Sequence, residues 1–178
     1  MYFVDASHFV SASFLGWVWC LVRPYVRAAS GRQRYNVLGA VNAVTHQLVT
    51  AINATYITAT SARALLQKIA SRGVSVPVTR VMGNARYRRC ASVADTATVL
   101  GIELLFRPSH SPNLNLIERL WTFVKKDVLN SRHHQDFQTF RDAIDGCLAD
   151  LPTKHPEELA TLMTHNFQTW DNVSLLNA

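Results

Sequence analysis

Apolar residues recur at helical spacing in the stretch that follows Pro112. They fall at positions i, i+3, i+4, i+7 and i+11 and so form one stripe on an α-helix: Ile117, Leu120, Trp121, Val124 and Val128. Pro108 and Pro112 keep the preceding backbone out of a helix, and the Asn113–Asn115 region offers side-chain acceptors for the first free amides. We therefore expect a helix from Leu116 onward. Glu118 lies about 100° of helical rotation from the centre of the stripe, at the margin of the core.

The remaining pattern alternates between strand-like and helix-like segments. Branched and aromatic residues mark strands at Met1–Val4, Phe14–Val22, Tyr35–Val44, Leu48–Ile52, Val76–Met82 and Ile102–Phe106. Helical spacing predicts helices at Ala62–Ser71 with Thr60 and Ser61 as its cap, at Ala91–Leu100, after an Asp136 cap, and from Pro156. This order predicts an α/β fold in which an antiparallel sheet portion is extended by strands joined through helical crossovers. The first strand should lie centrally, with the strand after the first helix parallel to it.

Composition places the chain among globular proteins, and residues 1–178 are expected to form one domain. Charged residues make up 17% and hydrophobic residues 48%, which excludes a disordered chain. The net charge of +6 favours a polyanionic partner, with nucleic acid as the first candidate. The longest apolar run, Phe14–Val22, is too short to span a membrane, so we expect a cytoplasmic protein or, in a bacterium, a nucleoid-associated one.

Two acidic residues stand where packing alone does not explain them. Asp5 directly follows the first strand-like run, and because an unpaired carboxylate buried in a sheet is costly, it needs a capping role or a cation. The helix that carries Glu118 can fold back over the edge of the sheet where Asp5 lies. Carboxylates meeting there would suit Mg²⁺ ions and in-line attack at a phosphodiester. Read alone, Glu118 is also compatible with an ordinary solvated residue at a helix boundary.

Four segments resemble the catalytic core of a transposase family: YFVDASHF, SGRQRYNVLGAVNAVTHQLVT, RVMGNARYRRC and LGIELLFRPSHSPNLNLIERLWTFVKK. The family is that of bacterial insertion-sequence transposases in the mariner-like superfamily, and the SPNLNLIERLW block is highly specific. The resemblance implies a DDE endonuclease domain with an RNase H-like fold, a mixed five-stranded sheet with an antiparallel portion and flanking helices. It also implies cutting of transposon ends with Mg²⁺ or Mn²⁺ and strand transfer into target DNA. Asp5 then matches the first catalytic acid and Glu118 the third, both as metal ligands.

The second acid of the family's motif falls at Gly83. The 34 residues between Gly83 and Glu118 form the family's characteristic gap, so the register fits although the residue does not. Glycine has no ligand atom, the neighbouring Asn84 carries no charge, and Asp95 should face solvent from its helix. We therefore expect weakened metal occupancy and impaired catalysis. Three hypotheses stay open: an active enzyme completed by another ligand, a catalytically inactive DNA-binding or assembly subunit, and a transposase remnant without a retained role.

Basic residues near the expected site are candidate DNA contacts, and each is equally compatible with a solvated surface. They are Arg32, Arg34, Arg86, Arg88, Arg89, Lys125 and Lys126. Trp17, Trp19 and Trp121 have core spacing and are interpreted as packing residues. Members of the family place helix-turn-helix modules before the catalytic core, whereas Met1 here lies almost on the first strand. The resemblance therefore implies that end recognition comes from a separate chain or is absent, and a homodimer is a compatible assembly.

Overall fold

The computed structural model describes residues 1–11, 21–22, 33–72, 78–82, 90–106, 114–130 and 132–167, and only the backbone within 78–82. The strands are β1 (Tyr2–Val10), β2 (Arg34–Asn42), β3 (Leu48–Asn53), β4 (Val78–Met82) and β5 (Ile102–Phe106). The helices are α1 (Ala59–Ala70), α2 (Ala91–Val99), α3 (Leu116–Leu129), α4 (Phe137–Lys154) and α5 (Pro156–Leu162). The predicted α/β class is confirmed.

The described strands form one mixed sheet in the order β3-β2-β1-β4-β5. β1, β2 and β3 pair antiparallel, whereas β4 lies parallel to both β1 and β5. The first strand is therefore central and parallel to the strand after the first helix, as predicted. β4 pairs only with the Tyr2–Val4 part of β1, while β2 pairs with β1 as far as Val10. From Asp5 onward, β1 thus has a described neighbour on one side only.

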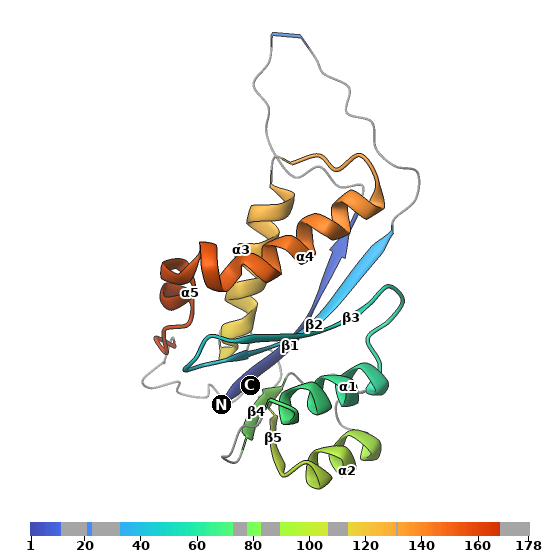
Figure 1. The fold of residues 1–178 in the computed structure, drawn as a ribbon, viewed down its shortest axis with the longest axis vertical. Coiled ribbons are helices and arrows are strands. Elements are labelled where there is room, and N and C mark those ends of the chain that lie inside the picture. The colour runs from blue at the N-terminus through green and yellow to red at the C-terminus, as the bar shows by residue number, and fades with distance from the viewer. Residues whose placement is uncertain are drawn as a thin grey trace, which may run out of the picture.

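Helices cover both faces of this sheet (Figure 1). α1 and α2 pack on one face around Leu65, Leu66 and Ile69, and α3 and α4 pack on the other. Side chains of β1 alternate between the two cores: Tyr2 and Val4 belong to the first, and Phe3 and Phe9 belong to the second. The same alternation assigns Asp5 and Ser7 to the α3 face.

Several predicted boundaries are wrong. β1 does not end near Asp5, because its pairing with β2 continues to Val10. α1 begins earlier than predicted, with Thr58 rather than Thr60 or Ser61 at the N-cap, and Ser61 Oγ accepts from the Thr58 N–H at 3.4 Å. Most of the predicted Phe14–Val22 strand lies outside the described residues, and its described part, Leu21 and Val22, is exposed and not in a strand.

The predicted end signals hold for α2 and α4 and fail in part for α3. Gly101 follows the C-cap of α2 and has a φ of +65°, a conformation that glycine adopts without strain. The Asp136 side chain accepts from the Thr139 N–H at 2.7 Å and caps α4, which lowers the Asp136 pKa. Asn115 occupies the N-cap position of α3, but its side chain makes no capping hydrogen bond, so that part of the prediction is wrong.

A tyrosine on β2 ties the sheet to α4. The Tyr35 hydroxyl donates to the two carboxylate oxygens of Asp145, each at 2.7 Å, and the Arg141 guanidinium lies 5.2 Å from the centre of the Tyr35 ring. Burial, followed by the hydrogen bond to Asp145, raises the pKa of Tyr35 to about 12. The neutral hydroxyl is therefore the form that the fold favours.

Replacing Tyr35 with Phe should lower the free energy of unfolding at pH 7 by about 1–2 kcal/mol, because Asp145 loses a hydrogen-bond donor. The pKa of Tyr35 is raised in the folded state, so its contribution is complete below the ordinary value of about 10 and is lost as pH rises toward 12. Urea denaturation of both proteins from pH 7 to pH 12 measures this difference. A difference that stays constant across the range would contradict the assignment.

Candidate functional site

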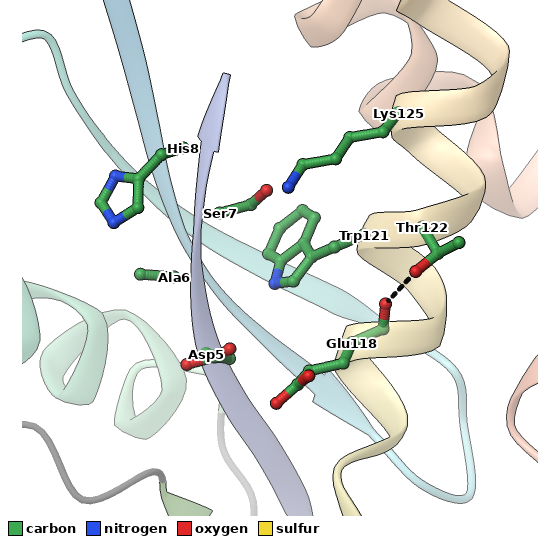
Figure 2. Close-up of a pocket in the computed structure, with 8 residues that line it drawn as sticks. All are labelled: Asp5, Ala6, Ser7, His8, Glu118, Trp121, Thr122 and Lys125. Atoms are coloured by element: carbon green, nitrogen blue, oxygen red, sulfur yellow. Dashed lines mark hydrogen bonds between the residues drawn. The ribbon is translucent and has the colours of Figure 1, made fainter. Parts of the chain in front are cut away.

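Asp5 and Glu118 line one pocket between β1 and α3. The pocket has a volume of about 230 Å³ and is lined by Asp5, Ala6, Ser7, His8, Glu118, Trp121, Thr122 and Lys125. Figure 2 shows the Glu118 side chain reaching from α3 toward β1 at the level of Asp5. Both acids are half-buried, which confirms that Glu118 lies at the margin of the core. Two acids far apart in the sequence are thus brought together.

The packing of α3 fixes where Glu118 lies. One side of the helix is fully inside the core, with Ile117, Leu120 and Val124 at 0% exposure. Glu118 stands in the first turn, where its N–H donates to the Asn115 carbonyl at 3.0 Å, and the Thr122 hydroxyl donates to the Glu118 carbonyl at 3.0 Å. Because its neighbour Ile117 is buried against the sheet, Glu118 is held at the edge of that contact.

A glycine on β2 allows α3 to approach the sheet closely. Gly39 is the β2 partner of Asp5, and a Cβ at Gly39 would lie 2.6 Å from Trp121 Cζ2 and 2.8 Å from Trp121 Cη2. The indole therefore rests directly on the β2 backbone. The indole also meets the Phe9 ring edge-on, at 6.3 Å between ring centres and an interplanar angle of 85°. The missing side chain at Gly39 sets the spacing between the two elements that carry the acids.

Arg119 anchors the first turns of α3 to the end of α5 and the segment that follows it. Its guanidinium donates to the carbonyls of Leu162, Thr164 and Asn166 at 3.2, 2.8 and 3.0 Å. It also lies 5.7 Å from the centre of the Phe167 ring. The residue next to Glu118 is thus held by several contacts to a distant part of the chain, which restrains the helix at the pocket.

The position of the expected second acid lies just beyond the described part of β4. Met82 pairs with Val4, the residue before Asp5, and the chain continues into Gly83. Gly83 and Asn84 themselves lie outside the described residues, as do Arg32, Arg86, Arg88 and Arg89. The sheet register therefore directs the end of β4 toward the level of Asp5.

The two carboxylates suit a hard dication but do not complete a site for one. Oxygen ligands are those that Mg²⁺ and Mn²⁺ prefer, and Asp5 and Glu118 supply them from two elements. Within the described ranges, no group of three or more His, Cys, Asp or Glu side chains could hold a metal ion. His8 points away from α3 in Figure 2, and its Nδ1 bonds Asn36 Oδ1 at 2.6 Å. Asp95 is exposed on α2, as predicted.

The basic candidates in the described residues are divided among three places. Lys125 lines the pocket of Asp5 and Glu118, and its Nζ lies 5.9 Å from the centre of the Phe9 ring. Lys126, one residue further, lines a separate pocket beside Asp127 and Asn130. Arg34 is exposed near His8 on the opposite side of β1. Of these three residues, only Lys125 lines the same pocket as the two acids.

Sequence reasoning missed three residues of this region. Gly39 had a signal, because a glycine inside an apolar strand often marks a close approach of another element. Ser7 had none, since its face depends on the register of β1. Trp121 packs in the core as predicted, but its indole nitrogen also faces the pocket (Figure 2).

A family model described as a DDE superfamily endonuclease matches residues 1–141. The chain belongs to this family. A comparison with curated proteins found no match. The described residues contain no helix that is both long and apolar enough to cross a membrane.

Solved structures of transposase and integrase complexes share the fold. The Mos1 strand transfer complex matches at 13% identity with a TM-score of 0.60, over 93% of this chain and 55% of that one. The Mos1 mariner paired end complex with Mn matches at 15% identity with a TM-score of 0.59, over 96% and 56%. A simian T-cell lymphotropic virus intasome matches at 14% identity with a TM-score of 0.52, over 94% and 51%. This chain spans about half the length of these proteins.

Replacing Gly39 with Ala should destabilise the fold by about 1–3 kcal/mol, because the new methyl group would overlap the buried Trp121 ring. Gly146 on α4 provides a matched control, since a Cβ there has nothing within 4 Å, and Ala is favoured over Gly in a helix by about 0.5–1 kcal/mol. Denaturant unfolding of the two variants measures both effects. Equal stabilities for the two variants would show that the indole does not rest on the β2 backbone.

Proposed function

We propose that this chain is the catalytic domain of a DDE transposase with an RNase H-like fold, and that its pocket handles a DNA strand. The observation that carries this proposal is the meeting of Asp5 and Glu118 in one pocket, at the point on β1 where pairing with β4 stops. Membership of the endonuclease family supports the same reading. In this proposal, Asp5 and Glu118 are ligands of Mg²⁺ or Mn²⁺.

A bound dication in such a site activates the attacking oxygen and stabilises the leaving oxygen of a phosphodiester. The chain's own part is to hold two oxygen ligands on rigid elements, one in the middle of a paired strand and one on a helix seated on Gly39. Two ligands held in fixed positions would keep the cation and the DNA strand in a fixed geometry relative to each other, and catalysis by positioning depends on such a geometry.

Gly83 makes the proposed site deficient. Two carboxylates offer about one negative charge fewer than the three that the family's motif supplies, so an ion at the incomplete position is held weakly. We propose a reduction in rate of the order of 10² to 10⁴ relative to a complete site. The second candidate function follows from the same residue: with the pocket and Lys125 retained and one acid missing, a subunit that binds DNA without cutting it is the alternative.

Replacing Gly83 with Asp restores the missing acid and tests whether this pocket is a metal site. Calorimetric titration of Mn²⁺ should give at most one weakly bound ion for the unmodified chain and two for Gly83→Asp, because the third carboxylate completes the site. Adding Glu118→Gln to Gly83→Asp should remove the gain. Asp95→Asn is the matched control, since it removes an exposed acid on α2 and should change nothing. Identical isotherms for the unmodified chain and Gly83→Asp would refute the proposed second-acid position.

Two neighbouring lysines test the DNA reading. Lys125→Ala should weaken binding to duplex DNA and reduce the slope of log affinity against log salt by about 1, because one phosphate contact is lost. Lys126→Ala, in a different pocket, should have the smaller effect. Fluorescence anisotropy at several salt concentrations gives both slopes, and a parallel cleavage assay with Mn²⁺ separates the enzyme from the binding subunit. Equal effects of the two lysines would mean that the pocket is not the DNA site.

A further inference from the structure

Two buried polar atoms beside the acids have no partner in the described part of the chain. They are the indole Nε1 of Trp121 and the hydroxyl Oγ of Ser7. The two residues are only 4% and 2% exposed. Because buried hydrogen-bonding groups are almost always satisfied, a donor without an acceptor in the protein takes one from outside it, either a water molecule or a ligand.

Ser7 and Trp121 both line the pocket that contains Asp5 and Glu118. In Figure 2 the indole nitrogen lies on the edge of the ring that faces the two carboxylates, and the Ser7 hydroxyl lies near the end of the Lys125 side chain. Ser7 is on the α3 face of β1 because it is two residues from Asp5. Ser7 on β1 and Trp121 on α3, which carry the two donors, therefore line the same pocket.

The direction of the indole N–H is fixed by packing. One side of the Trp121 ring rests on the β2 backbone at Gly39, and the edge contact with Phe9 limits rotation. A phenylalanine would fill much of the same apolar space without burying an unpaired N–H. The nitrogen is the part of Trp121 that core packing does not require.

The chemistry of the pocket restricts what the ligand can be. Asp5 and Glu118 offer oxygens that attract cations, whereas Trp121, Ser7 and Lys125 offer hydrogen-bond donors. A group that meets both sets must carry several acceptor oxygens and be able to approach the acids through a cation. A phosphodiester of a nucleic-acid strand has this composition, and a neutral N–H can contact its non-bridging oxygen without competing for the cation.

We propose that the Trp121 indole N–H donates a hydrogen bond to a non-bridging phosphate oxygen of a DNA strand bound beside Asp5 and Glu118, with the Ser7 hydroxyl as a second donor. This assignment rests on the proposed DNA function and adds to it two neutral hydrogen-bond donors that bind the phosphate. Trp121 is then a binding residue as well as a packing residue.

The first experiment measures the unmodified sequence, and a variant is used only to assign one signal. In a ¹⁵N-labelled full chain, the four tryptophans give four indole N–H signals, and Trp121→Phe identifies one of them. Titration with a short DNA duplex in Ca²⁺ should move the Trp121 signal downfield, saturating together with the binding isotherm from anisotropy. The other three indoles are internal references.

The second experiment removes only the donor. Trp121 is replaced with 3-benzothienylalanine, in which sulfur takes the place of the N–H and the shape of the ring system is kept. DNA affinity should fall roughly 10-fold, the effect of losing one hydrogen bond to a charged acceptor. Ser7→Ala should have a smaller effect in the same direction. Thr98→Val is the matched control and should leave the affinity unchanged, because the Thr98 hydroxyl makes the same kind of bond, to the Ala94 carbonyl at 3.0 Å, on α2 away from the pocket.

The outcomes separate this proposal from the one on which it rests. A shifted indole signal together with weaker binding by the sulfur analogue supports the hydrogen bond to phosphate. DNA that binds with an unmoved indole, or with equal affinity for the analogue, overturns the hydrogen bond and leaves the DNA function standing. A protein that binds no DNA at all overturns both.

Discussion

The contact between the Trp121 ring and the backbone of Gly39 is the constraint on which the pocket depends. Gly39 is the pairing partner of Asp5, and Trp121 lies one helical turn after Glu118. One close approach therefore sets the separation of the strand that carries one acid from the helix that carries the other. Any side chain at Gly39 would push α3 outward, and the change in spacing would reach Glu118 directly because the first turns of a helix move together.

Electrostatics adds a second constraint. Two half-buried carboxylates that border one small space repel each other, and positive charge that enters that space lowers the repulsion. Lys125 supplies one such charge from the same helix, and a dication would supply more. The anchoring of Arg119 by three backbone carbonyls keeps a further cation out of the pocket although it is next to Glu118 in the sequence. Of the two residues, Lys125 is the one that lines the pocket.

The sequence predicted those parts of the fold that depend on local pattern. The stripe beginning at Ile117 identified α3 and placed Glu118 at its margin, and the order of elements gave a central first strand parallel to β4. What depends on pairing between distant segments was missed. The extension of β1 past Asp5 follows from its register with β2, and the seat for Trp121 at Gly39 follows from that register together with the approach of α3. Neither is encoded in the spacing of residues along one segment.

In the proposed function, binding a DNA strand and cutting it depend on different residues of the same pocket. Cutting requires a full set of acidic ligands, and the position that Gly83 occupies in the motif reduces that set. Holding a phosphate requires donors, which Lys125, Trp121 and Ser7 offer whatever residue follows Met82. Loss of an acid removes negative charge from the neighbourhood of an anionic ligand, so it weakens metal binding without weakening the attraction of the donors for phosphate. In the proposed function, such a chain loses catalysis before it loses affinity for DNA, because the packing of Trp121 on Gly39 holds the donors in place whether or not a metal is bound.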